Sequence, residues 1–184
     1  MKFTGWLNKL KNAYLRELRG YRGRFVLAAS VLALVLLLIF TLAAQTNDPI
    51  PKKIVSSVPF TIYYPNQSAL PSGFKLNLSS FQSVSPGVVI YSVSYAGNKE
   101  VVFSEQKKPS TNTIKQFAAN YIPLHTTFNT PIGNGIYGAY NDGSGLKSVI
   151  SLPIQNGPWL IVTAPSSLSR AQFIKIIDSL IKAD

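Results

Sequence analysis

The chain of 184 residues contains no cysteine, one histidine and only 7 acidic residues. The lack of cysteine excludes disulfides, thiolate metal sites and a thiol nucleophile. A single histidine excludes every catalytic or metal site that needs two. Lysine and arginine together number 18, so the formal net charge is +11. Such an excess is typical of nucleic-acid-binding proteins, but its meaning depends on where the basic residues lie.

Charge is absent altogether from residues 25–44, which also lack glycine and proline. A helix of this length rises about 30 Å, the thickness of the hydrocarbon core of a bilayer. Thirteen of the 20 residues are Leu, Val, Ile or Phe. At about −0.3 to −0.6 kcal/mol each, they favour insertion by roughly 4 to 8 kcal/mol. The run therefore predicts a transmembrane helix, along which lie Phe25, Leu32, Leu36, Phe40 and Ala44.

The residues on the two sides of this run differ in charge. Seven basic residues and Glu17 precede it, a net charge of +6, whereas Asp48 is the single charge in residues 45–51. Basic flanks stay in the cytoplasm, so we expect a single-pass plasma-membrane protein with a cytoplasmic N-terminus and an extracytoplasmic C-terminal domain. The residues that set this topology include Lys9, Lys11, Arg16, Arg19, Arg22 and Arg24.

The basic region of 24 residues and the apolar run of 20 are both longer than those of a removable signal peptide. We therefore expect an uncleaved signal anchor, with cleavage at Thr41-Leu42-Ala43 as the alternative. Apolar residues recur every three or four positions within residues 1–24. This pattern predicts a basic amphipathic tail on the anionic inner leaflet, unless its charges only fix the topology or it binds a partner. Residues 45–57, with two prolines, are predicted to be a linker.

Residues 58–184 are predicted to form one extracytoplasmic α+β domain. Residues 89–95 and 101–104 alternate between apolar and polar and flank a Gly-Asn turn, so they form a hairpin. Further strands are predicted at 60–64, 74–78, 132–140, 146–152 and 159–163. One helix is predicted at 112–121, and a second begins at the capping box of Ser169 and Gln172. The apolar stripe of this second helix comprises Phe173, Ile176, Ile177, Leu180 and Ile181.

This stripe needs a sheet to cover it. The predicted architecture is therefore an N-terminal transmembrane helix followed by an antiparallel β-sheet domain with one or two helices packed on a face.

Residues 133–138 read GNGIYG and match the G-x-G-x-x-G motif of dinucleotide-binding folds. That motif needs a helix directly after it and an acidic residue about 20 positions on. The residues that follow here alternate like a strand, so we predict a glycine-containing strand and no cofactor.

Catalytic and metal-binding combinations are also sparse. His125 with Asp142 and a serine is one candidate for a hydrolase, but no G-x-S-x-G elbow accompanies it. Glu100 and Glu105 are five positions apart and point to opposite faces of a strand, which argues against a paired-carboxylate site. The loop at residues 141–144 offers too few oxygen donors for calcium. We expect no enzyme, no metal and no cofactor, with an envelope hydrolase using His125 as an alternative.

Two surface features suggest partners. Residues 45–184 carry 11 basic and 6 acidic residues, a dispersed net charge of +5 that does not indicate nucleic acid. Adhesion to cell-wall polymer or DNA is an alternative, through Lys52, Lys53, Lys107 and Lys108. Seven tyrosines either fill one face of the sheet or form a strip that binds glycan or peptide. They are Tyr63, Tyr64, Tyr91, Tyr95, Tyr121, Tyr137 and Tyr140.

The segment LSRAQFIKIIDSL (residues 168–180), which follows the strand-like PWLIVTA, resembles the closing helix of a known outer-surface domain. Some membrane-bound anti-sigma-factor and sporulation-associated proteins of Gram-positive bacteria carry this domain of unknown function. YYPNQSALPSGFKL (residues 63–76) is similar to an earlier segment of the same family. The resemblance implies a sensing or ligand-binding outer domain without catalytic residues. The tail of 24 residues is too short for a sigma-binding domain.

These observations together predict a membrane-anchored protein with a non-catalytic binding, sensing or assembly domain at the bacterial cell envelope. Its partners would be the lipid bilayer together with envelope proteins, peptide, lipid or cell-wall polymer.

Overall fold

The structure is a computed structural model that describes residues 49–183. The predicted transmembrane residues Phe25, Leu32, Leu36, Phe40 and Ala44 lie outside the described residues. So do the basic residues expected to set the topology, which are Lys9, Lys11, Arg16, Arg19, Arg22 and Arg24. Among residues 49–183, no helix is both long and apolar enough to cross a bilayer.

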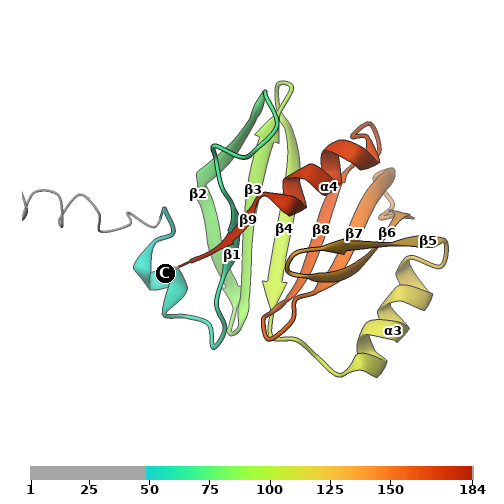
Figure 1. Cartoon of the computed structure of the whole chain (residues 1–184), viewed down its shortest axis with the longest axis horizontal. Helices are drawn as coiled ribbons and strands as arrows, with labels where there is room; N and C mark the ends of the chain where they lie inside the picture. Colours follow the sequence, from blue (N-terminus) through green and yellow to red (C-terminus); the bar gives the residue numbers. More distant parts are fainter. Residues whose placement is uncertain (1–48, 184) are drawn as a thin grey trace, which may run out of the picture. The chain divides into compact units, whose positions relative to one another are not determined.

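The described chain is built around a seven-stranded antiparallel sheet in the order β2-β3-β4-β8-β7-β6-β5 (Figure 1). Its strands are β2 (Phe74–Ser85), β3 (Val88–Tyr95), β4 (Lys99–Gln106), β5 (His125–Thr130), β6 (Gly133–Asn141), β7 (Leu146–Pro153) and β8 (Trp159–Pro165). A second, two-stranded sheet pairs β1 (Tyr63–Pro65) with β9 (Leu180–Lys182). The helices are α2 (Lys52–Val55), α3 (Thr111–Tyr121) and α4 (Arg170–Asp178). The predicted antiparallel α+β fold is confirmed.

One face of the large sheet, here the first face, is buried under α4 and the β1-β9 sheet (Figure 1). The strand register places Tyr91, Phe103 and Val162 side by side on this face, and none of them is exposed to solvent. α4 covers them with its own buried residues, Phe173, Ile176 and Ile177. Each large apolar side chain buried in this way contributes about 1.5 to 3 kcal/mol.

The opposite, second face is covered at one end by α3. The ring of Phe117 on α3 meets the ring of Trp159 edge-on at a centroid distance of 5.0 Å. Leu160 and Val162 of β8 are two positions apart, so both side chains lie on the first face. Trp159 directly precedes Leu160, so its side chain lies on the second face. The predicted helices are thus both present, but they pack on opposite faces of the sheet.

The end of the last helix differs from the prediction. The Ser169 hydroxyl accepts a hydrogen bond from the Gln172 N–H at 3.3 Å, and the predicted capping box is complete. α4 nevertheless ends at Asp178, so the assignment of Leu180 and Ile181 to the helix is wrong. Backbone pairing explains the difference, because these residues form β9 alongside β1.

Candidate functional site

The β1 strand lies on the first face with only one partner strand. On the β9 side, the Ile62 carbonyl accepts a hydrogen bond from the Ala183 N–H at 2.8 Å. Successive residues of a strand direct their N–H and C=O groups to opposite sides, so those of Tyr63 point toward the interior of the domain. Buried backbone groups need partners, because an unpaired one costs about as much as a lost hydrogen bond.

Glu105 and Tyr91 provide these partners. The Glu105 side chain has no exposed surface, and the Tyr63 N–H donates to both of its carboxyl oxygens at 3.1 Å. The Tyr91 hydroxyl donates to the Tyr63 carbonyl oxygen and lies 2.9 Å from Glu105 Oε1. We call these three residues the Glu105 cluster. They join β1, β3 and β4 by a closed ring of polar contacts inside an apolar core.

Counting hydrogens assigns the protonation state of this carboxyl group. The Tyr63 carbonyl oxygen can only accept, so it takes the single phenol hydrogen of Tyr91. A hydrogen on the carboxyl group would satisfy the 2.9 Å contact between Glu105 Oε1 and the Tyr91 hydroxyl, so the neutral carboxyl group fits this geometry better than the carboxylate. Burial acts in the same direction: it raises the pKa of Glu105 to about 8, against the lowering effect of the bond from the Tyr63 N–H. Burial and the nearby Glu105 also raise the pKa of Tyr91.

The structure places Glu100 and Glu105 on opposite faces of β4, as their spacing predicts. Glu105 is fully buried on the first face, and Glu100 is exposed on the second. Glu100 Oε1 accepts a 3.3 Å hydrogen bond from the Ser92 hydroxyl. Burial of Glu105 was not predicted, although its alternation with Val101 and Phe103 along the strand was a signal for it.

A second feature lies on the second face, beyond α3. Cross-strand partners place side chains of β3, β4 and β8 next to one another there, and these side chains are only half-buried. The described helices lie elsewhere: α4 on the first face, α3 over Trp159 and α2 beside β2. We call this uncharged surface the open patch; its residues are Val88, Ile90, Val102, Ser104, Ile161 and Thr163.

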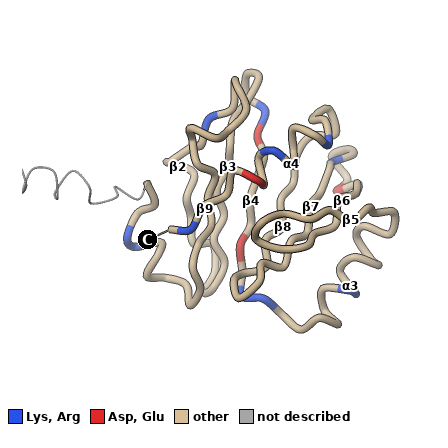
Figure 2. Tube along the Cα trace, viewed as in Figure 1, with Lys and Arg blue, Asp and Glu red and all other residues tan. Residues whose placement is uncertain are grey.

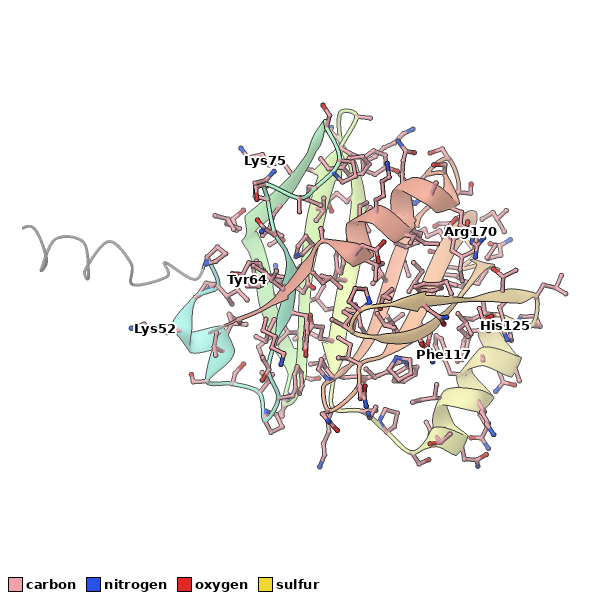
Figure 3. The ribbon with its side chains drawn as sticks, viewed as in Figure 1. Lys52, Tyr64, Lys75, Phe117, His125 and Arg170 are labelled. Carbon is pink, nitrogen blue, oxygen red and sulfur yellow. The ribbon has the colours of Figure 1, made fainter. Side chains whose placement is uncertain are left out.

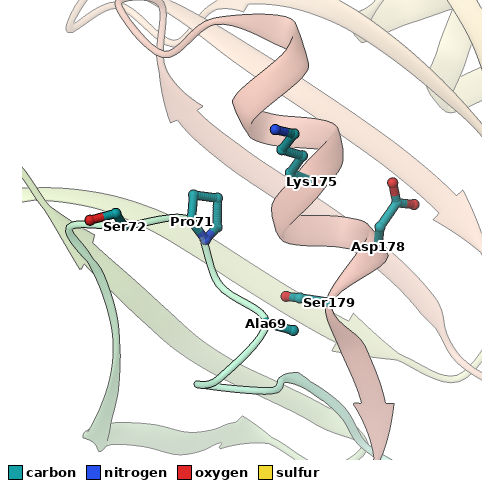
Figure 4. A pocket seen from close by; sticks show the side chains of 6 residues that line it. All are labelled: Ala69, Pro71, Ser72, Lys175, Asp178 and Ser179. Carbon is teal, nitrogen blue, oxygen red and sulfur yellow. The ribbon is translucent and has the colours of Figure 1, made fainter.

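A shallow cleft of about 470 Å³ lies between α4 and the loop before β2 (Figure 4). Its lining includes the exposed Lys175 and Asp178. The Ser179 hydroxyl, also in this lining, donates to the Ile176 carbonyl at 2.7 Å and is therefore already paired. The cleft is open and holds few polar groups that converge, unlike a small-molecule site.

The residues of the hydrolase hypothesis have separate partners. His125 Nδ1 lies 2.7 Å from the Ile122 carbonyl oxygen at the start of β5. Asp142 forms a 2.6 Å ion pair with Lys147 across the turn between β6 and β7. Among residues 49–183, no hydrogen bond joins His125 to Asp142, and no group of three His, Cys, Asp or Glu residues is arranged to hold a metal ion.

The predicted polyanion site is also divided between elements. Lys52 and Lys53 are exposed on α2. Figure 3 shows Lys52 at the opposite end of the view from His125. Lys108 donates to the Ile154 carbonyl at 3.0 Å and so has a structural partner. Lys107 lines a second open cleft, beside Ser57. Figure 2 shows the basic residues spread over separate elements of the domain.

The tyrosines mainly fill the core. Tyr63, Tyr64, Tyr91 and Tyr95 are at most 9% exposed, which leaves them unavailable as a binding strip. Tyr121 is 57% exposed, and Tyr137 and Tyr140 are half-buried. The GNGIYG segment opens β6, where Gly135 packs against Phe128 of β5. A strand in this position matches the prediction.

Comparisons with protein-family models, with curated proteins and with solved structures found no match. The resemblance to the outer domain of anti-sigma-factor and sporulation-associated proteins therefore stays a prediction.

Proposed function

We propose that the chain is a single-pass membrane protein whose extracytoplasmic α+β domain is a non-catalytic assembly module at the bacterial cell envelope. The charge-free run at residues 25–44 and the basic residues before it support the membrane anchor and its orientation. The open patch is the observation that supports an assembly role for the outer domain.

The chemistry of the open patch favours a protein partner. Its aliphatic side chains provide apolar area, while the hydroxyl groups of Ser104 and Thr163 can form hydrogen bonds across an interface. The fully buried core of a protein–protein interface is likewise depleted in charged residues. An anionic cell-wall polymer would instead need lysine or arginine, and the open patch contains neither.

Cysteine labelling tests the anchor and the open patch together, because the chain has no cysteine of its own. Three single-cysteine variants are made in the full chain and treated with a membrane-impermeant maleimide in intact bacterial spheroplasts. Thr4→Cys reports on the tail. Ser166→Cys reports on an exposed position between β8 and α4, and Ser104→Cys reports on the open patch.

The proposed topology requires Ser166→Cys to react in intact spheroplasts and Thr4→Cys to react only after lysis. The reverse pattern would overturn it. A partner on the open patch would make Ser104→Cys react more slowly in spheroplasts than in the purified chain, with Ser166→Cys reacting equally in both. If Ser104→Cys reacts at the same rate in both preparations, the open patch is not covered and the assembly role is wrong.

A further inference from the structure

We propose that Glu105 is a proton-operated latch that fastens β1 to the sheet. β1 is held from one side by β9, through contacts such as the hydrogen bond between Ala183 and Ile62. From the other side it is held by the Glu105 cluster, which binds both backbone groups of Tyr63. This inference concerns the outer domain alone and does not depend on the membrane anchor.

The neutral carboxyl group satisfies every polar group in the cluster. It donates to Tyr91, Tyr91 donates to the Tyr63 carbonyl, and the Tyr63 N–H donates back to the carboxyl group. Loss of the proton leaves one phenol hydrogen for two acceptors, the carboxylate and the Tyr63 carbonyl. It also places an unpaired negative charge in a site with no exposed surface, which is strongly unfavourable. Opening of β1 admits water and relieves both penalties.

Among residues 49–183, Glu105 forms no ion pair that would compensate for this charge. β3 contributes Tyr91 and Val89, β1 contributes Tyr63, and β8 contributes Leu160, the register partner of Glu105. The charged side chains of the covering elements are exposed to solvent; they are Arg170, Lys175 and Asp178 of α4 and Lys182 of β9.

The direction of the pH effect follows from proton linkage. The closed state keeps its proton up to about pH 8, whereas a solvated carboxyl group loses it near the ordinary value of 4.5. Between these two values the open state binds fewer protons, so rising pH favours opening. The equilibrium constant for opening β1 should rise about tenfold per pH unit between about pH 5 and pH 8. Above pH 8 both states are ionised and the constant should level off.

Hydrogen exchange at the Tyr63 amide measures this opening directly, because that N–H is bound to Glu105. The full chain in lipid nanodiscs is compared with Glu105→Gln, whose neutral amide can donate to Tyr91 and accept from Tyr63 at every pH. Glu100→Gln, an exposed position on the same strand, is the matched control. Comparing variants at equal pH removes the intrinsic pH dependence of exchange.

We expect the wild-type chain and Glu100→Gln to lose protection steeply between pH 5 and pH 8, and Glu105→Gln to stay flat. Parallel profiles in all three chains would overturn the proposal. Infrared spectroscopy of the wild-type chain keeps the test valid if Glu105→Gln does not fold. A protonated carboxyl band that persists at pH 7 and titrates near pH 8 supports the latch, and its absence at pH 7 refutes it.

Discussion

Tyr91 and Tyr95 provide a matched test of the buried hydrogen bonds. Both lie on the first face of β3 and are 0% and 9% exposed. Each stacks on a phenylalanine at a centroid distance of 4.8 Å, Tyr91 on Phe103 and Tyr95 on Phe74. Their hydroxyl groups differ. Tyr91 binds Tyr63 and Glu105, whereas the buried Tyr95 hydroxyl has no hydrogen-bond partner among the described residues.

The expected effects of removing these hydroxyls follow from the number of partners left behind. Tyr91→Phe deprives two buried groups of their partner, the Tyr63 carbonyl and the Glu105 carboxyl. Each such group costs about 1 to 3 kcal/mol, so the free energy of unfolding should fall by about 2 to 6 kcal/mol. Tyr95→Phe removes a hydroxyl that is desolvated but unbonded, so stability should stay the same or rise slightly. Both variants keep the stacked ring.

Thermal unfolding of the full chain in detergent micelles, followed by near-ultraviolet circular dichroism, measures both variants. A domain of this size shifts its melting temperature by roughly 4 °C per kcal/mol, so Tyr91→Phe should melt about 8 to 24 °C lower. Tyr95→Phe should melt within about 2 °C of the wild type. Equal losses in the two variants would show that the hydrogen bonds of the Tyr91 hydroxyl do not stabilise the Glu105 cluster.

Two further predictions concern the second face and the turn after β6. A Cβ added at Gly138 would lie 2.4 Å from Ile122 Cγ2, so Gly138→Ala should destabilise the domain by about 1 to 3 kcal/mol. Combining it with Ile122→Ala in a denaturation cycle should cost less than the sum of the two single changes, and strict additivity would contradict the contact. The hydrogen bond from the Lys147 ammonium group has the largest effect on the Asp142 carboxyl and lowers its pKa. Hydrogen bonds from Ser144 lower this pKa further. Lys147→Met should raise that pKa toward its ordinary value in a carboxyl-carbon NMR titration, and unchanged midpoints would show that the ion pair does not form in solution.

Local patterns were sufficient to predict most of the large sheet. The hairpin of β3 and β4 alternates cleanly because one face of each strand is buried, and such alternation is visible without tertiary information. The start of α4 was equally accessible, since a capping box is a contact between residues three positions apart. These elements depend on near neighbours in the sequence.

The two missed strands, β5 and β9, lack an alternating apolar pattern of their own. β5 reads HTTFNT, with Phe128 as its only buried residue, so it carries no alternating apolar signal and is defined by pairing with β6. β9 continues the apolar spacing of α4 and was therefore assigned to the helix. Its pairing with β1, more than 110 positions earlier, decides its conformation. The same pairing leaves the buried N–H and C=O groups of Tyr63 without a partner strand, and Glu105 and Tyr91 bind them instead.

The role of Glu105 is a consequence of that edge. Sequence spacing places the side chain on the same face as Val101 and Phe103, where an acidic residue is costly unless it is neutral and hydrogen-bonded. Its partner is a backbone group 42 positions away, so no local pattern identifies it. An acidic residue whose side chain falls on the buried face of a strand is nevertheless informative. It implies that another buried polar group in the core needs a hydrogen-bond partner. In this chain that group is the backbone of β1, and the pH dependence of β1 opening should therefore follow the ionisation of Glu105, whose side chain lies on the buried face of β4.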